Sequence, residues 1–227
     1  MKNKYVIIVA GGQGLRMGGE IPKQFLLLND IPVLMHTIRA FYDYDSAIKI
    51  IVVLPENQQG YWQKLCKTYG FNIVHSLVLG GETRFHSVKN GLQLVEENAI
   101  VAIHDGVRPL ISKTVIANTF EQAELGKAVC PVIPLVDSIR EKTAGGTKSV
   151  NRADFCLVQT PQVFLSELIK EVYTQDYTKK FTDDISVFES YRNENPMLVA
   201  GSSGNIKITT PVDLATAEAI MKLRNSG

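Results

Sequence analysis

An α/β fold, with a mostly parallel sheet flanked by helices and a protruding β-hairpin arm, is the fold class that the sequence predicts. In the first half of the chain, short apolar runs alternate with amphipathic stretches, as in βα units around a buried parallel sheet. From about residue 136 to residue 155 the chain is polar and contains a GlyGly pair, which is typical of a hairpin. The 227 residues suit a single domain over 1–227, with the arm at about 136–155 inserted in it.

The central strands are predicted from runs rich in Ile and Val, at 5–10, 48–54, 71–75, 99–105 and 128–135. The amphipathic stretches between them predict helices at 33–44, 57–70, 83–98 and 112–125. Suitable end residues support three of these helices, namely Pro32, Gly70 and Ser112. The loops that follow the strands should therefore gather at the carboxyl edge of the sheet, where open α/β sheets bind ligands.

After the arm, the sequence predicts shorter elements. A short apolar segment at 157–164 precedes helices at 166–177 and 186–192, a strand at 205–209, and a last helix at 213–224 capped by Asp213. Asp183 and Asp184 are interpreted as a helix cap and a loop charge rather than as metal ligands. The arm exposes strand edges that favour pairing, so we expect it to pack against a second copy of the chain.

The composition argues against several classes of protein. A formal net charge of +1 gives no basic face for a polyanion, so we expect no nucleic-acid partner. The first apolar run is too short for a signal peptide or a spanning helix, which predicts a cytoplasmic protein with no membrane partner. Cys66, Cys130 and Cys156 are widely spaced and lack a CxxC pattern, so we expect reduced thiols rather than disulfides or a zinc site.

A glycine-rich loop, AGGQGLRMGGEIPKQ, begins at Ala10 where the first strand stops. Glycines let backbone amides approach a polyphosphate, and Arg16 and Lys23 supply cations that can offset phosphate charge. A dinucleotide-binding fingerprint fits poorly because Met17 stands where its last glycine is needed and no acidic residue ends the second strand. A Walker-type loop is also a poor fit, since no GlyLysSer or GlyLysThr follows.

Four later segments accompany this loop in order: GGETRFHSV at 80–88, HDGVRP at 104–109, QTPQ at 159–162 and GNIKIT at 204–209. Together the five segments resemble the 2-C-methyl-D-erythritol 4-phosphate cytidylyltransferases of the non-mevalonate isoprenoid pathway, a family of sugar and polyol phosphate nucleotidyltransferases. The resemblance spans essentially the whole chain. It implies a Rossmann-like fold, transfer of the cytidylyl group of CTP to 2-C-methyl-D-erythritol 4-phosphate with release of pyrophosphate, a magnesium ion (Mg2+) as cofactor, and a homodimer.

On the nucleotide side, the resemblance implies that the two cations Arg16 and Lys23 are catalytic. The residues it implies for nucleotide binding are Ala10, Gly11, Gly12, Gly14, Gly81, Arg84, Ser87 and Gly106. Asp105, at the end of a predicted strand, would bind substrate and Mg2+, because this ion prefers one or two carboxylates together with phosphates and waters. The sequence shows no nucleophile triad, which fits direct in-line attack.

On the acceptor side, the resemblance implies substrate binding by Arg108, Ser138, Arg152, Thr182 and Lys207. Of these, Arg152 and Lys207 are also implied to be catalytic, because an attacking phosphate needs fixed cations to hold it in line. The family arrangement would bring Arg152 and Thr182 from the neighbouring subunit, so that each active site is shared. Taken as isolated residues, Arg84, Arg152 and Lys207 would instead be ordinary surface charges. His104 is interpreted as a residue that either packs in the core or supports a site residue without contacting substrate.

The chain departs from the family pattern in two places. Ser138 stands where Thr is expected, and Gly106 and Val107 stand where two alanines are common. Both changes concern substrate selectivity rather than the charges needed for transfer. Three rival functions stay open at this point: a ribitol 5-phosphate cytidylyltransferase, a nucleotide-sensing module without catalysis, and a dinucleotide-dependent oxidoreductase.

Overall fold

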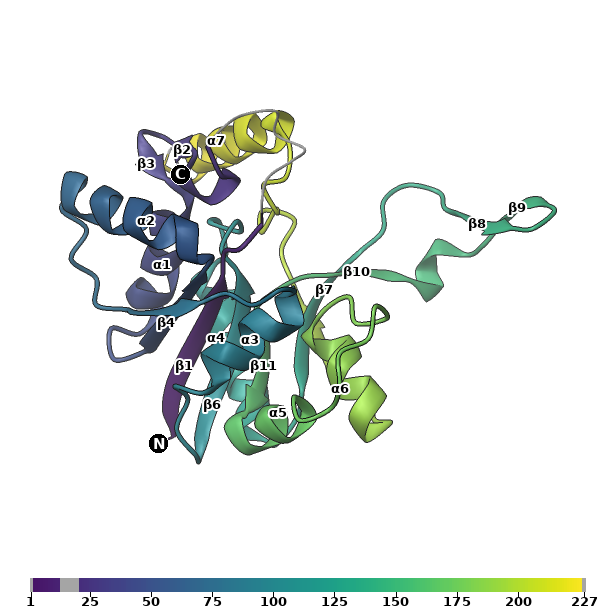
Figure 1. Cartoon of the computed structure of the whole chain (residues 1–227). Coiled ribbons are helices and arrows are strands. Elements are labelled where there is room, and N and C mark those ends of the chain that lie inside the picture. The colour runs from purple at the N-terminus through teal and green to yellow at the C-terminus, as the bar shows by residue number, and fades with distance from the viewer. Residues whose placement is uncertain (1, 13–20, 226–227) are drawn as a thin grey trace.

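The computed structural model describes residues 2–12 and 21–225 and contains one large sheet between helices (Figure 1). Its strands are β1 (Asn3–Val9), β4 (Lys49–Leu54), β5 (Ser76–Leu79), β6 (Ala99–Asp105), β7 (Val129–Pro134), β10 (Cys156–Val158), β11 (Gln162–Leu165) and β12 (Met197–Ala200). The order is β10-β7-β11-β6-β1-β4-β5, and β12 pairs with β7. The pairings β1·β4, β1·β6, β4·β5 and β7·β12 are parallel, whereas β10 and β11 run antiparallel to their neighbours. The predicted mostly parallel α/β fold is confirmed.

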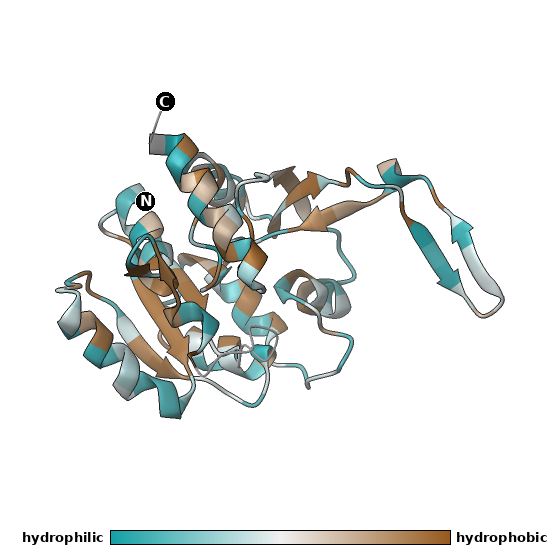
Figure 2. Ribbon diagram, turned by 90° about the horizontal axis from the view of Figure 1, so that it is seen from above, coloured by the Kyte–Doolittle hydropathy of each residue, from teal (hydrophilic) through white to brown (hydrophobic). Residues whose placement is uncertain are grey.

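Helices cover both faces of the sheet because successive side chains of a strand point to opposite faces. Val6 and Ile8 pack on the face covered by α1 (Val33–Tyr44), α2 (Glu56–Thr68) and α4 (Lys113–Glu124). Tyr5 and Ile7 pack on the face covered by α3 (Arg84–Leu92), α5 (Ser166–Val172) and α6 (Asp184–Arg192). Figure 2 shows hydrophobic residues concentrated in the central strands between these layers. No helix among the described residues is long and apolar enough to cross a membrane.

The last helix, α7 (Pro211–Asn225), packs against the hairpin of β2 (Leu27–Leu28) and β3 (Ile31–Pro32) through a smaller apolar cluster. The sequence predicted that Asp213 caps this helix, but the helix begins two residues earlier. Thr210 and Asp213 instead form a reciprocal pair, in which the Thr210 amide donates to Asp213 Oδ2 at 2.8 Å and the Asp213 amide donates to Thr210 Oγ1 at 3.3 Å. Thr210 is therefore the capping residue, and Pro211 takes the favourable first helical position.

Several predicted boundaries are confirmed to the residue. Strand 99–105 is β6 and helix 33–44 is α1. The Ser112 side chain caps α4 by accepting from the Val115 amide at 3.3 Å. Gly70, beyond the end of α2, has φ +56°, a left-handed conformation that glycine adopts readily. These elements were predictable because the spacing of their apolar residues and their end residues lie within a short stretch of sequence.

The strand predicted at 71–75 is wrong, because β5 begins only at Ser76. Residues 71–75 instead cover the end of α2. The Phe71 amide donates to the Cys66 carbonyl at 2.9 Å, and the Phe71 ring packs edge-on against Trp62 with centroids 6.0 Å apart. His75 accepts a hydrogen bond from Trp62 Nε1 at 3.0 Å. The apolar residues of this segment are therefore used to pack a helix rather than to extend the sheet.

The strand predicted at 205–209 is also wrong. This segment forms no ladder, and its Ile208 amide donates to the carbonyl of Val107, in the loop after β6, at 2.9 Å. Two predicted helices are shorter than expected. The helix predicted at 83–98 ends at Leu92, and Asn98 then adopts φ +54° just before β6 begins. The helix predicted at 166–177 ends at Val172.

The hairpin predicted within 136–155 is present as β8 (Arg140–Thr143) and β9 (Gly146–Ser149), which pair antiparallel. Gly146 has φ +133° at the turn, a conformation that favours glycine. Both strands are exposed along their length, and a short helix, η3 (Arg152–Asp154), follows them. Figure 1 shows that this arm extends well away from the sheet. The arm is therefore confirmed as a structure, whereas its role in dimerisation stays a prediction.

Candidate active site

A cavity of about 250 Å³ lies at the carboxyl ends of β1, β4 and β6. Its floor is formed by the residues that follow these strands, including Ala10 after β1, Pro55 after β4 and Asp105 at the end of β6. The segment 80–84 and Lys207 form further walls. The sheet thus brings four of the five sequence segments together at the edge where α/β proteins bind ligands.

Asp105 is the centre of charge in this cavity. Its Oδ2 atom lies 2.9 Å from Lys207 Nζ and 3.3 Å from Arg108 Nε, and its Oδ1 atom lies 3.7 Å from Arg84 Nε. Burial alone would raise the pKa of Asp105, but Arg84, Lys207 and Arg108 together hold that pKa well below its ordinary value. Asp105 is therefore a carboxylate at neutral pH, as a ligand of a hard cation must be.

The loop after β1 supplies backbone amides and a cation. Gly11, Gly12 and Lys23 all line the cavity. The carbonyl of Ala10 accepts a hydrogen bond of 2.6 Å from Nε2 of the buried Gln24, which fixes the start of the loop. Gln24 ends the glycine-rich segment, but no sequence signal marks it as a residue that fixes the loop. The predicted residues Gly14 and Arg16 lie outside the described part of the chain.

The segment 80–87 is shaped by two of the predicted nucleotide-binding residues. Ser87 Oγ donates to the Thr83 carbonyl at 3.0 Å and accepts from the Gly81 amide at 3.0 Å, so it holds the turn closed. A Cβ atom added to Gly81 would lie 2.4 Å from the Cβ of His86, so the turn leaves room only for glycine. At Gly80 and Gly81 the turn therefore presents backbone without a side chain to the cavity.

Gly106 follows Asp105 and is packed against the loop after β1. Its amide donates to the Val9 carbonyl at 2.9 Å, and an added Cβ would lie 2.8 Å from the Cβ of Ala10. The alanine that is common in the family at this position would therefore have to push the two loops apart. The glycine observed here permits a closer approach between the loops after β1 and β6.

Arg84 lines the cavity, but its guanidinium is directed toward α6. Its two terminal nitrogens donate to the two carboxylate oxygens of Asp184 at 2.8 and 2.6 Å. Burial alone would lower the pKa of Arg84, but Asp184 raises it above the ordinary value, so the guanidinium stays charged. The interpretation of Asp184 as a loop charge is wrong, because this residue begins α6 and is fully buried. Asp183 is the predicted cap, with its side chain accepting from the Ser186 amide.

Three further predicted residues lie near Asp105. Lys207 lines the cavity, whereas Arg108 and His104 do not. The Lys207 side chain is 43% exposed. Arg108 is 11% exposed and donates to the Asn205 carbonyl at 2.7 Å, which ties it to the segment carrying Lys207. His104 is fully buried against Phe41, and burial lowers its pKa to about 4. His104 is therefore buried and does not line the cavity, in agreement with the expectation.

Besides Arg108, three predicted acceptor-side residues do not line this cavity. Ser138 and Arg152 are exposed on the arm, where Arg152 donates to the Val136 carbonyl. Thr182 is exposed before α6, and its amide donates to Ser186 Oγ at 2.9 Å. Within one chain, the cavity therefore has nucleotide-side residues and Lys207 but lacks the other acceptor-side groups predicted from the sequence.

The donors at the cavity fit Mg2+ bound largely by a substrate. The described residues contain no cluster of three or more His, Cys, Asp or Glu side chains that could hold a metal ion alone. Asp105 nevertheless offers one carboxylate beside a loop of glycine amides. Because Mg2+ is commonly held by one or two carboxylates together with substrate phosphates, this set suits Mg2+ carried in with a triphosphate.

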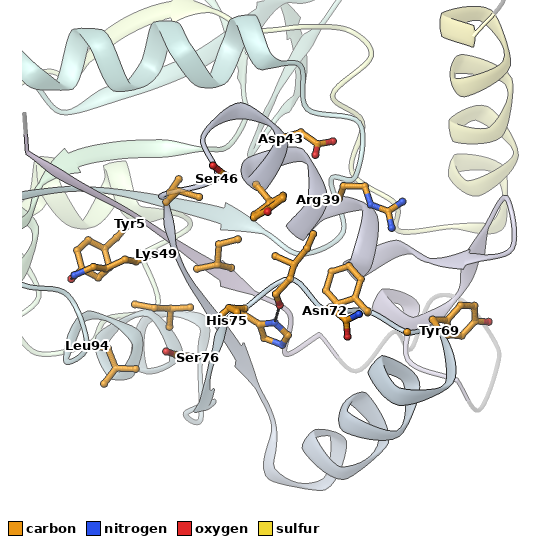
Figure 3. A pocket seen from close by; sticks show the side chains of 18 of the residues that line it. Tyr5, Arg39, Asp43, Ser46, Lys49, Tyr69, Asn72, His75, Ser76 and Leu94 are labelled. Carbon is orange, nitrogen blue, oxygen red and sulfur yellow. Dashed lines mark hydrogen bonds between the residues drawn. The ribbon is translucent and has the colours of Figure 1, made fainter.

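A larger cavity, of about 960 Å³, lies near the starts of β1 and β4. Figure 3 shows Tyr5, Lys49 and His75 among its labelled side chains. Lys49 pairs with Glu96 at 2.6 Å, and the two ring nitrogens of His75 contact Trp62 and the Ile73 carbonyl. These polar groups therefore already have partners, and none of the predicted site residues lines this cavity.

Comparison with known proteins gives one consistent family. Residues 4–223 match the family model described as IspD, 2-C-methyl-D-erythritol 4-phosphate cytidylyltransferase. Proteins of that name from Azobacteroides pseudotrichonymphae and Phocaeicola vulgatus are 56% and 55% identical to this chain, cover 97% and 96% of it, and are themselves covered completely. The crystal structure of 4-diphosphocytidyl-2C-methyl-D-erythritol synthase from Anaerococcus prevotii has a TM-score of 0.82 at 28% identity, with 97% of this chain and 96% of that chain covered.

Proposed function

We propose, from the premise that the chain belongs to the 2-C-methyl-D-erythritol 4-phosphate cytidylyltransferase family, that the cavity beside Asp105 is its active site. The enzyme transfers the cytidylyl group of CTP to 2-C-methyl-D-erythritol 4-phosphate, giving 4-diphosphocytidyl-2-C-methyl-D-erythritol and pyrophosphate. The family match does not favour the ribitol phosphate alternative or a module without catalysis. The observation that carries the assignment of the site is the convergence of Lys23, Asp105 and Lys207 on one cavity.

The arrangement suits an in-line displacement at the α-phosphorus of CTP. An oxygen of the acceptor phosphate forms the new bond, and the bond to the β-phosphate bridge breaks, so that pyrophosphate leaves with the electron pair. Lys23 and the amides of Gly11 and Gly12 would bind the triphosphate, with Arg16 completing the set. Lys207 would orient the incoming phosphate. Fixed cations stabilise the charge that develops during such a transfer without having to reorganise.

Asp105 would hold Mg2+, which supplies charge neutralisation on the phosphates when bound. Arg108 and Arg84 lie beside this carboxylate and keep it ionised. The turn at 80–87 would receive the base, because it presents the backbone around Gly81 and Ser87 to the cavity. A turn of closely packed backbone can select a base by its size, since a base larger than cytosine would not fit against it.

The proposal includes a homodimer with shared active sites. Large apolar side chains are exposed where the arm leaves the body, including Val136, Phe155 and Leu157, which are 81%, 49% and 51% exposed. Such a patch favours a protein partner. A second copy related by two-fold symmetry would cover the same patch on both subunits. It would also let Ser138, Arg152 and Thr182 complete the neighbouring cavity, which they do not reach within their own chain.

A cytoplasmic location without nucleic-acid or membrane partners completes the proposal. Cys66, Cys130 and Cys156 are free thiols, as a reducing compartment requires. The formal net charge of +1 gives no excess of cations for a polyanion. Fractionation of cells that express the chain would test the location, and recovery in the membrane fraction would contradict it.

The substrate and cofactor assignments are tested together by one assay. Pyrophosphate release is measured with each of four nucleoside triphosphates, with methylerythritol phosphate or ribitol phosphate, and with or without Mg2+. We expect release with CTP, methylerythritol phosphate and Mg2+, and a loss of activity when Mg2+ is removed with a chelator. Full activity without a divalent cation would contradict the role of Asp105. Faster turnover of ribitol phosphate would contradict the substrate.

A further inference from the structure

Arg84 and Asp184 form a paired ion contact that links the nucleotide side of the cavity to α6. The terminal nitrogens of Arg84 bind both Asp184 oxygens at 2.8 and 2.6 Å, whereas only its Nε atom faces Asp105, at 3.7 Å. Two carboxylates therefore compete for one guanidinium. The geometry shows that Asp184 holds the forked end, and a fork on a carboxylate is the stronger of the two arrangements.

The fold holds the Asp184 carboxylate firmly in place. Asp184 is fully buried, and Tyr173 donates a hydrogen bond of 2.6 Å to its Oδ1 atom. On either side of it, Gln162 donates to Asp183 Oδ2 at 2.8 Å and accepts from the Ile185 amide at 2.9 Å. A buried carboxylate with these contacts cannot follow Arg84 toward the cavity, so it sets where the guanidinium lies.

The position of Arg84 is unfavourable unless Asp184 offsets it. Arg84 is the first residue of α3, where the helix dipole disfavours a cation. Asp184 is the first residue of α6, where the dipole favours an anion. Around Asp105, the three cations Arg84, Arg108 and Lys207 face the two carboxylates Asp105 and Asp184. Without Asp184, Asp105 would be the one carboxylate that pairs with these three cations within the described part of the chain.

We propose that Asp184 is a positioning residue for the transfer reaction. This inference rests on the proposed function of the cavity and concerns how Asp105 is kept available there. By binding the two terminal guanidinium nitrogens of Arg84, referred to as its fork, Asp184 keeps these nitrogens away from Asp105. Oδ1 of Asp105, which Arg84 Nε approaches only to 3.7 Å, is then available to bind the cation that accompanies the triphosphate. Asp184 acts through Arg84 and does not touch the substrate.

The variant Asp184→Asn tests this directly, because it keeps the size of the side chain and removes the charge. We expect the fork of Arg84 to turn to Asp105, and a crystal structure of the variant should show both terminal nitrogens within about 3 Å of that carboxylate. We expect kcat to fall about 10- to 100-fold while KM for CTP changes less than about threefold, since the loop amides that bind CTP are unchanged. Normal kcat, or a fork that stays away from Asp105, would overturn the inference.

Two further variants separate positioning from folding. Glu189→Gln removes an equal charge from an exposed position later in α6, so kcat should stay within about twofold. The double variant Asp184→Asn with Arg84→Gln has no fork to misdirect, so its kcat should recover to within about tenfold of the parent. All rates are measured at a temperature well below the thermal unfolding midpoint of each variant, which circular dichroism determines. A double variant no faster than Asp184→Asn would overturn the inference.

The parent enzyme keeps this test independent of the proposed function. If the unaltered chain releases no pyrophosphate from CTP and methylerythritol phosphate, the proposed function fails before any variant is compared. If the parent is active and Asp184→Asn is equally active, only the positioning role of Asp184 fails.

Discussion

Lys207 Nζ lies 2.9 Å from Asp105 Oδ2 at the mouth of the cavity. The two groups differ in exposure, since the Lys207 side chain is 43% exposed and that of Asp105 is 10% exposed. A buried carboxylate thus holds a half-exposed cation next to the place where two phosphates are proposed to meet. This pair joins the end of β6 to the segment before α7, which are distant in the sequence, and it depends on the whole sheet being formed.

We expect Lys207→Met to lower kcat/KM for the acceptor about 100-fold, because a fixed cation near the developing charge is lost. The free energy of unfolding should change by less than about 1 kcal/mol, since a half-exposed ion pair contributes little to stability. Pyrophosphate release and thermal unfolding measure the two effects separately. Lys64→Met, on the exposed face of α2, is a matched control that should keep full activity. A proportional loss of stability and activity would contradict the catalytic role.

Lys23→Ala should lower turnover far more than it weakens CTP binding. The loop amides would still bind the triphosphate, whereas the charge that develops during transfer would lose a fixed cation. Calorimetry gives the dissociation constant for CTP, and pyrophosphate release gives kcat. We expect the same pattern for Arg16→Ala. Equal losses in both quantities would show that these cations serve ground-state binding instead.

A mixing experiment tests whether the active sites are shared. Lys207→Met and Arg152→Ala should each be nearly inactive alone. If Arg152 serves the neighbouring subunit, a mixed dimer has one intact site and one doubly defective site. Random mixing should then restore about a quarter of the parent activity. No recovery after subunit exchange, verified by native mass spectrometry, would place both residues in one subunit's site or separate them from catalysis.

The cysteines should differ sharply in their reactivity toward iodoacetamide. Burial raises the pKa of Cys130 to about 12 and that of Cys66 to about 11. Only the thiolate reacts, and at pH 8 a thiol with a pKa near 12 is ionised in about one molecule in ten thousand. Cys156 is exposed on β10 and should be alkylated first. Mass spectrometry of a time course measures this order, and labelling of Cys130 at the rate of Cys156 would show that β7 is accessible.

The sequence predicts the parts of this fold whose signals are local. Strand 99–105 and the helix at 33–44 match the structure because their apolar patterns extend over the whole element. The alternation around Lys207 has the same appearance, yet 205–209 is not a strand. Ile206 and Ile208 pack in the cluster beneath α7 instead, and no strand of the described residues pairs with this segment. A short alternating run specifies which side chains are buried, but not what they are buried against.

The same distinction holds at the site. Asp105 was predictable because it ends a predicted strand within a specific motif, and Gly81 because its segment resembles that of the family. The structure adds that only glycine fits the turn at position 81. Asp184 was misinterpreted, since its role depends on Arg84, which lies 100 residues earlier. No local pattern separates a buried counter-ion from a loop charge in the segment TDD. The pairing becomes visible only when the fold brings α3 and α6 together.

The loop after β1 and the carboxylate of Asp105 are proposed to bind a metal-bearing triphosphate. A crystal structure of the enzyme with CTP and Mg2+ tests this most directly. We expect the phosphates to contact the amides of Gly11 and Gly12 and the amine of Lys23, the cation to bind Asp105, and the base to lie against the turn at 80–87. A nucleotide bound instead in the larger cavity near Tyr5 and His75 would contradict the account.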